Sequence, residues 1–280
     1  MTPALPLLIE PRDLAAHLGH PGLLLVDLSK PQIYAQAHLP GAISVDFKRL
    51  QRGHGPEAGL LPEKAALEAL LTDIGLTPTH HVVAYDDEGG GWAGRFLWLL
   101  ETVGHTQYSY LNGGIHAWLD DALPSTTVPA APAPAHWHLG TLSPDTQVDL
   151  DYVLRRHTNP DVIIWDARSP EEFSGARAFA LRGGHIPGAV NYEWTRALDP
   201  ERGLRLKAAD LLRRELADEG ITAAHDVIVH CHTHHRSGLA WLAGRVLGFP
   251  RIRAYPGSWS EWGNHPGTPI TTRQDQDTSV

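Results

Sequence analysis

The sequence is poor in cysteine: only Cys231 occurs among 280 residues. A single thiol excludes an intrachain disulfide and a cysteine-rich zinc module, and it favours a reducing compartment such as the cytoplasm. No run of about 18 apolar residues is present, so we expect no membrane-spanning helix. Residues 1–10 contain no lysine or arginine, which argues against a secretory signal. Acidic residues outnumber basic ones, 32 to 23, and this excess argues against general nucleic-acid binding.

An internal repeat runs through the sequence. Three pairs of similar segments recur in the same order, separated by 144 to 147 residues, and the clearest reads His-Leu-Pro-Gly-Ala in one copy and His-Ile-Pro-Gly-Ala in the other. The pairs are 38–42 with 185–189, 82–86 with 227–231, and 112–118 with 256–262. A fourth pair, 26–29 with 165–168, is only 139 residues apart, which indicates about eight extra residues around 174–183. Colinear matches at nearly one spacing indicate a duplicated domain.

The boundary between the copies is marked by composition. Residues 128–134 alternate proline with alanine, a pattern that favours extended backbone and forms no core. We therefore predict one domain at 1–124, a linker at 125–146 and a second domain at 147–280.

Short apolar runs alternate with helical patterns in both copies. Continuous runs predict buried strands at 23–27, 81–85, 162–166 and 226–230, and helical spacing predicts helices at 62–74, 92–103, 207–219 and 237–247. Ser-Pro-Glu-Glu at 169–172 is typical of a helix start. This alternation predicts an α/β fold in which each copy has a mostly parallel sheet flanked by helices on both faces. Ligands of such sheets bind where strands end and helices begin.

Cys231 lies at such a junction. It follows the strand predicted at 226–230, and a helix is predicted to begin at 237. Inward-facing loop amides, the start of a helix and the cationic Arg236 would favour the thiolate, the nucleophilic form of cysteine. The matching loop of the first copy has Asp86 instead of a thiol, and it carries three acids. Because residues 1–125 hold 7 basic and 14 acidic residues, against 16 and 18 in 126–280, we expect an anion site on the second copy only. The alternative is that Cys231 is simply a small buried hydrophobic residue.

The repeat and this loop resemble the rhodanese family of sulfurtransferases in its tandem-domain form, over nearly the whole chain. The resemblance rests on Asp-x-Arg at 166–168, Gly-His-Ile-Pro-Gly-Ala at 184–189, the cysteine loop at 231–237 and Pro-Gly-Ser-Trp at 256–259. It implies two tandem rhodanese-like domains, of which the first is inactive and the second catalytic.

The resemblance also implies a reaction. Cys231 would take the outer sulfur of thiosulfate, hold it as a persulfide and pass it to cyanide or a thiol acceptor, with no cofactor. The expected substrate-binding residues are those of the loop, together with Arg168, whose alternative role is to pair with Asp166, and Trp194, placed near the loop by the resemblance alone. The loop residues are His232, Thr233, His234, His235, Arg236 and Ser237. We expect a monomer, with a sulfur-accepting protein as a further partner.

Four other interpretations stay open. Loop histidines beside a cysteine could bind zinc, but no second cluster completes a ligand set, so we predict no metal. The related 3-mercaptopyruvate sulfurtransferases have a different cysteine loop and tend to carry arginine where this chain has Glu172. A persulfide carrier that delivers sulfur to one protein would use the same cysteine. A cysteine-dependent phosphatase is disfavoured because only four residues separate Cys231 from Arg236, one fewer than its phosphate cradle needs.

Overall fold

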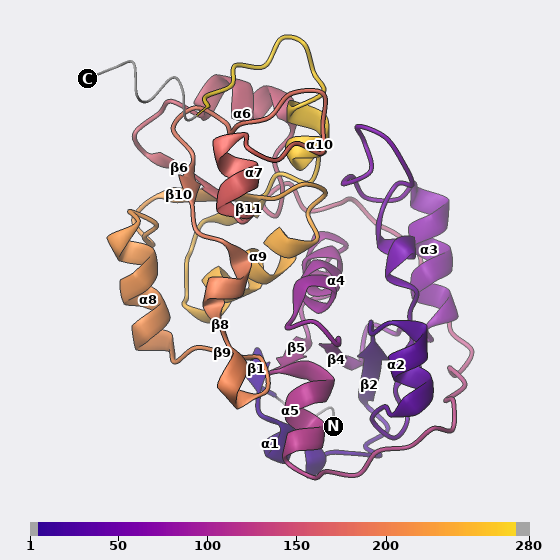
Figure 1. Cartoon of the computed structure of the whole chain (residues 1–280). Coiled ribbons are helices and arrows are strands. Elements are labelled where there is room, and N and C mark those ends of the chain that lie inside the picture. Colours follow the sequence, from indigo (N-terminus) through magenta and orange to yellow (C-terminus); the bar gives the residue numbers. More distant parts are fainter. Residues whose placement is uncertain (1–4, 273–280) are drawn as a thin grey trace. The chain divides into compact units, whose positions relative to one another are not determined.

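The computed structural model describes residues 5–272, and none of the helices in that range is long and apolar enough to cross a membrane. Contacts within the chain divide it into two compact units (Figure 1). The first comprises Met1–Gln51, Pro62–Ser143 and Leu198–Leu206, and the second comprises Arg52–Leu61, Pro144–Ala197 and Lys207–Val280. Each unit therefore includes one short segment from the other half of the sequence.

The first unit is built on a parallel sheet of five strands in the order β1-β5-β4-β2-β3. Its strands are β1 (Leu8–Ile9), β2 (Leu23–Asp27), β3 (Ile43–Ser44), β4 (His81–Tyr85) and β5 (Tyr108–Leu111), with the antiparallel pair β8 (Leu198–Asp199) and β9 (Arg205–Leu206). Its helices are α1 (Pro11–Ala15), α2 (Pro31–Gln36), α3 (Lys64–Asp73), α4 (Gly91–Thr102) and α5 (Gly114–Asp120), with 3-10 turns η1 (Phe47–Leu50) and η3 (Pro200–Arg202).

The second unit repeats this plan with a parallel sheet of four strands in the order β11-β10-β6-β7. Its strands are β6 (Val162–Asp166), β7 (Val190–Asn191), β10 (Asp226–His230) and β11 (Ile252–Ala254). Its helices are α6 (Leu150–Arg156), α7 (Pro170–Ser174), α8 (Ala209–Asp218), α9 (Arg236–Val246) and α10 (Ser258–Trp262), with the 3-10 turn η2 (Trp194–Ala197).

The predicted fold class is confirmed, because both sheets are parallel and flanked by helices. The four predicted strands are β2, β4, β6 and β10 with the predicted bounds, and the predicted helices are α3, α4, α8 and α9 with bounds that differ by up to two residues at either end. The helix start predicted at Ser169 is a capping box: its hydroxyl accepts from the Glu172 N–H, and Glu172 reaches back to the Ser169 N–H.

Each sheet buries both faces. In the second unit, Ile164 and Ile228 pack with Trp259 and Trp262 of α10 in one apolar cluster. The other face of β10 is covered by α9, which contacts both β10 and β11. Because both faces are apolar, polar groups of the strands gather at their ends, where each loop turns into the next helix.

Asp86 occupies such an end in the first unit. It follows β4, is fully buried, and accepts backbone N–H bonds from Glu88 (3.1 Å), Gly90 (2.8 Å) and Ala93 (2.9 Å). Burial, followed by the negative charge of Glu88, raises the pKa of Asp86 to about 7 in spite of these three donors. The loop between β4 and α4 thus encloses a carboxyl group, and the group carries a proton more readily than an exposed one.

The raised pKa of Asp86 predicts a pH-dependent loss of stability. The unfolded chain releases the Asp86 proton near its ordinary pKa of 3.8, whereas the folded chain keeps it until about pH 7. Raising the pH through this window therefore lowers the free energy of unfolding by up to about 4 kcal/mol. In Asp86→Asn this contribution disappears, so chemical unfolding at pH 4 to 8 should give a flatter profile than the wild type.

The exposed Asp13 provides the control, because Asp13→Asn should leave the wild-type profile unchanged. If the free energy of unfolding changes with pH in the same way in the wild type and in Asp86→Asn, Asp86 does not have a raised pKa in the folded chain.

Candidate active site

Strand β10 places Cys231 at the carboxyl edge of the second sheet. All residues of β10 are buried, and Cys231, which follows the strand, is 1% exposed. Helix α9 begins at Arg236, so only four residues separate the thiol from the helix. The first N–H groups of a helix have no partner within it and carry partial positive charge, which favours an anion at this position. The thiol therefore lies at the predicted junction.

The backbone around Cys231 is held by the start of α10. The Cys231 carbonyl accepts from the Trp259 N–H at 3.0 Å, and the His232 carbonyl accepts from the Ser260 N–H at 2.9 Å. The Cys231 N–H donates to the Ser258 hydroxyl at 3.4 Å. Because these bonds come from a segment near 260 and not from the loop itself, the loop is fixed from outside as well as by β10.

His234 gives the loop its tight curvature. Its φ of 55° lies in the left-handed region, which costs a residue with a side chain on the order of 1 kcal/mol. Its ring Nδ1 lies 2.8 Å from the hydroxyl of Ser237, and both side chains are buried. His234 and Ser237 therefore shape the loop from within.

The first unit shows what a loop of this type can hold. Asp86 corresponds to Cys231 at the 145-residue spacing, and the amides of Glu88 and Gly90 that bind its carboxyl group correspond to those of Thr233 and His235. The same strand-loop-helix path can therefore direct backbone donors at a buried acidic group on its first residue.

Arg236 is held by Glu172, at the start of α7. The guanidinium donates through two nitrogens to the two carboxylate oxygens, at 2.5 and 2.8 Å. Burial opposes the charge of Arg236, but its bonds to Glu172, followed by its attraction to the Cys231 side chain, raise its pKa. Burial likewise acts to raise the pKa of Glu172, but the bonds and charge of Arg236 outweigh burial and lower it. The cation near the thiol is thus fixed in place by an almost buried acid.

Arg168 is paired within the fold. It is 1% exposed and donates to both oxygens of Asp166 and to the Gly184 carbonyl at 2.8 Å. Its guanidinium lies 4.3 Å from the centroid of the Trp259 ring. His230 Nε2 is 3.5 Å from the same Asp166 carboxylate. Arg168 thus pairs with Asp166, which is the alternative role predicted for it from the sequence. Contact between Arg168 and the substrate stays a prediction.

The remaining predicted residues surround the loop. The Trp194 ring lies 6.0 Å from the ring of His235, and the Phe179 ring lies 5.9 Å from that of His232. Burial, followed by the positive charge of Arg236, lowers the pKa of His232, so its ring is neutral near pH 7. Thr233 lines a surface groove next to His232. The structure therefore brings Trp194 beside the loop. That Trp194 and the loop residues contact the substrate stays a prediction.

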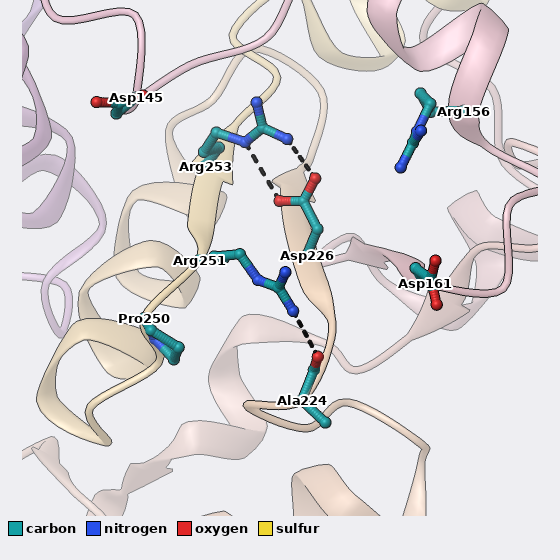
Figure 2. A pocket seen from close by; sticks show the side chains of 8 residues that line it. All are labelled: Asp145, Arg156, Asp161, Ala224, Asp226, Pro250, Arg251 and Arg253. Atoms are coloured by element: carbon teal, nitrogen blue, oxygen red, sulfur yellow. Dashed lines mark hydrogen bonds and ion pairs between the residues drawn. The ribbon is translucent and has the colours of Figure 1, made fainter.

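A second cavity, of about 740 Å³, lies at the opposite edge of the sheet, where β10 begins. Two of its charged side chains pair with each other: Figure 2 shows Arg253 bound to Asp226, and it shows Arg251 donating to the Ala224 carbonyl. It is lined by Asp145, Arg156, Asp161, Ala224, Asp226, Pro250, Arg251 and Arg253. None of these residues carries a thiol or a hydroxyl group. Across residues 5–272, no three His, Cys, Asp or Glu side chains converge as a metal-binding group.

Two features of the site were not anticipated from the sequence. The first is that Glu172 binds Arg236, since the two residues are 64 positions apart and nothing local links them. The second is the groove beside His232, which combines four separate segments of the sequence. The extra residues around 174–183, which the first copy lacks, are the feature of the sequence that could have indicated this groove.

Comparisons with known proteins identify the family of the chain. The rhodanese-like domain family matches residues 10–121 and 149–265. The chain is 50% identical to the thiosulfate sulfurtransferase of Pseudomonas aeruginosa over 266 residues and to that of Azotobacter vinelandii over 267 residues, in each case covering 95% of this chain and 97% of the relative. Among solved structures, an anaerobic ergothioneine biosynthesis enzyme from Chlorobium limicola has the same fold, with a TM-score of 0.84 at 21% identity, covering 95% of this chain and 70% of that one. Two family matches in tandem, over most of its length, show that this chain belongs to the rhodanese family.

Proposed function

We propose that this chain is a thiosulfate sulfurtransferase that carries sulfur on Cys231. Its two closely similar relatives bear that name, and its only thiol stands at the carboxyl edge of a parallel sheet. Thiosulfate is the donor, and cyanide or a thiol is the acceptor. A lone thiol also suits a reducing compartment, and we place the protein in the cytoplasm. Because one cysteine carries the reaction, a monomer is sufficient for activity.

The reaction takes two steps through one intermediate. The Cys231 thiolate attacks the outer sulfur of thiosulfate, a new S–S bond forms, and sulfite leaves with the electron pair of the old one. The terminal sulfur of the resulting persulfide carries the negative charge. Cyanide then attacks this sulfur, thiocyanate leaves, and the Cys231 thiolate returns. Neither step needs an external oxidant or reductant.

The observation that carries this proposal is the pair of matching loops. In the first unit the loop encloses a carboxyl group with three backbone donors. In the second unit the same position holds a thiol, so the N–H groups of Thr233 and His235, which correspond to two of these donors, would face the terminal sulfur of a persulfide. Because Cys231 is almost fully buried, this intermediate would also be shielded from water and from stray thiols.

Thiosulfate fits the charges near the thiol better than a keto acid does. A carboxylate substrate is best held by an arginine with two free nitrogens. Here both terminal nitrogens of Arg236 already bind Glu172. The pair is neutral overall and leaves no open fork, which argues against 3-mercaptopyruvate as the preferred donor.

Two further functions use the same cysteine. A persulfide carrier would transfer sulfur to one protein faster than to cyanide or small thiols. A phosphatase would hydrolyse an aryl phosphate, but the four-residue spacing between Cys231 and Arg236 favours a smaller guest than a phosphoryl group. Comparing thiocyanate formation with aryl-phosphate hydrolysis separates the latter from sulfur transfer.

The persulfide on Cys231 can be weighed directly. Intact mass after exposure to thiosulfate should increase by one sulfur atom, because Cys231 is the only thiol in the chain. Cyanide should remove this mass, and Cys231→Ala should never gain it. A mass gain in Cys231→Ala, or thiocyanate turnover by Cys231→Ser, would place the chemistry elsewhere.

The pair between Glu172 and Arg236 should matter for turnover. In Glu172→Gln, one carboxylate oxygen becomes an amide whose protons face the guanidinium, so Arg236 loses half of its support. We expect kcat/KM for thiosulfate and cyanide to fall by about tenfold, equal to about 1.4 kcal/mol. Initial rates over a range of thiosulfate concentrations give this ratio.

The neighbouring Glu171 is a matched control, because it carries the same charge but is exposed. Glu171→Gln should keep wild-type rates. An equal fall of kcat/KM in both variants would mean that the total negative charge at the helix start, and not the bond to Arg236, causes the effect. Unchanged kcat/KM in both variants would mean that turnover does not depend on the bond between Glu172 and Arg236.

A further inference from the structure

A groove of about 550 Å³ lies beside the Cys231 loop, within the second unit. It starts at His232 and Thr233, the two residues after the thiol, and it has the size of a site for a small organic molecule. Its lining comes from four separate segments of the sequence: Gly53, His54, Gly55, Pro56 and Ala58; Phe179 and Leu181; His232 and Thr233; and Ser260 and Asn264.

The lining of the groove carries no formal charge. None of the residues that line it is a lysine, arginine, aspartate or glutamate. Arg236 and Glu172, by contrast, form an ion pair close to the thiol. A doubly charged donor gains nothing from the groove, whereas an uncharged molecule with an apolar body loses little water there.

Two apolar side chains are exposed in the groove. Phe179 is 62% exposed and Leu181 is 85% exposed, the most exposed large apolar side chain of the described residues. Both belong to the segment around 174–183 that the first copy lacks. Exposed apolar side chains that gather at a functional site commonly mark a contact surface.

The segment that presents these side chains is firmly attached. The Leu181 N–H donates to the Asn264 side chain at 2.9 Å, and the Trp259 indole donates to the Arg182 carbonyl at 3.1 Å. The Arg182 guanidinium donates to the carbonyls of Trp262 and Thr268, at 3.0 and 2.9 Å. Leu181 is therefore exposed on a fixed backbone and not on a loose loop.

The groove is also tied to the active loop. Ser260 donates its N–H to the His232 carbonyl and its hydroxyl to the Gly55 carbonyl, both at 2.9 Å, and Asn264 donates to the Ser260 carbonyl at 2.7 Å. A Cβ at Gly59 would lie 1.9 Å from the Pro256 carbonyl oxygen, so only glycine allows the segment 52–61 to approach this closely. The walls of the groove and the thiol loop thus share one frame.

We propose that this groove binds the apolar body of an uncharged organic thiol that accepts the sulfur from Cys231. The proposal rests on the sulfur-transfer function proposed above. The acceptor thiolate attacks the outer sulfur of the persulfide, the bond between that sulfur and Cys231 breaks, and its electron pair returns to Cys231 as thiolate. The product is the organic persulfide of the acceptor, and the acceptor's proton is released to solvent.

The test compares three acceptors with thiosulfate as the donor: cyanide, 2-mercaptoethanol and 2-phenylethanethiol. Cyanide is too small to reach the groove, and the two thiols differ in their apolar body. We expect kcat/KM of the wild type to be about tenfold higher for 2-phenylethanethiol than for 2-mercaptoethanol. Leu181→Ser should lower the value for 2-phenylethanethiol about fivefold and leave those for cyanide and 2-mercaptoethanol unchanged.

Val128→Ser is the matched control, because Val128 is a similarly exposed apolar side chain outside the groove, and it should leave all three acceptors unchanged. If cyanide is turned over but neither the wild type nor Leu181→Ser distinguishes the two thiols, the groove proposal fails and the sulfur-transfer function stands. If the wild type forms no thiocyanate at all, both fail.

Discussion

Burial of an acidic group at the carboxyl edge of a parallel sheet is the constraint on which the site depends. Both faces of the sheet are apolar, so polar groups at this depth gather at the strand ends, among them the backbone amides of the loop that leads into the next helix. In the first unit these donors bind Asp86, whose pKa of about 7 shows how strongly burial opposes a carboxylate there. A sulfur anion is larger and more weakly hydrated, so it loses less on burial, and the same loop suits a persulfide better than a carboxylate.

In the proposed two-step transfer, the surroundings of Cys231 would divide the work. The Arg236–Glu172 pair places two fixed opposite charges near the thiol, and the groove at His232 provides an uncharged, apolar wall. One thiol that serves two chemically different substrates in turn needs such a division, because a site matched to the dianionic donor would bind an apolar acceptor poorly. The buried network of Arg168, Asp166 and His230 lies beneath and keeps the strand ends in place.

The parts of the fold that follow from local patterns could be predicted from the sequence. The sequences of β6 and β10 are largely continuous apolar runs because both faces of these strands are buried. Ser169 and Glu172 are close enough in sequence that their pattern predicts the start of a helix. Cys231 could be placed because a strand, a loop and a helix follow one another there. The pairing of Glu172 with Arg236 could not, since it depends on how α7 and α9 pack and not on spacing. The groove was missed for the same reason: Gly55 and Ser260 are 205 positions apart and meet only in the folded chain.

In the proposed reaction, sulfur leaves thiosulfate before any acceptor arrives. This order can be tested by the amount of sulfite released when the enzyme is mixed with excess thiosulfate in the absence of an acceptor. We expect a rapid release of one sulfite per chain, after which release stops until an acceptor is added. Release of no sulfite without an acceptor, with normal turnover once both substrates are present, would contradict a persulfide intermediate.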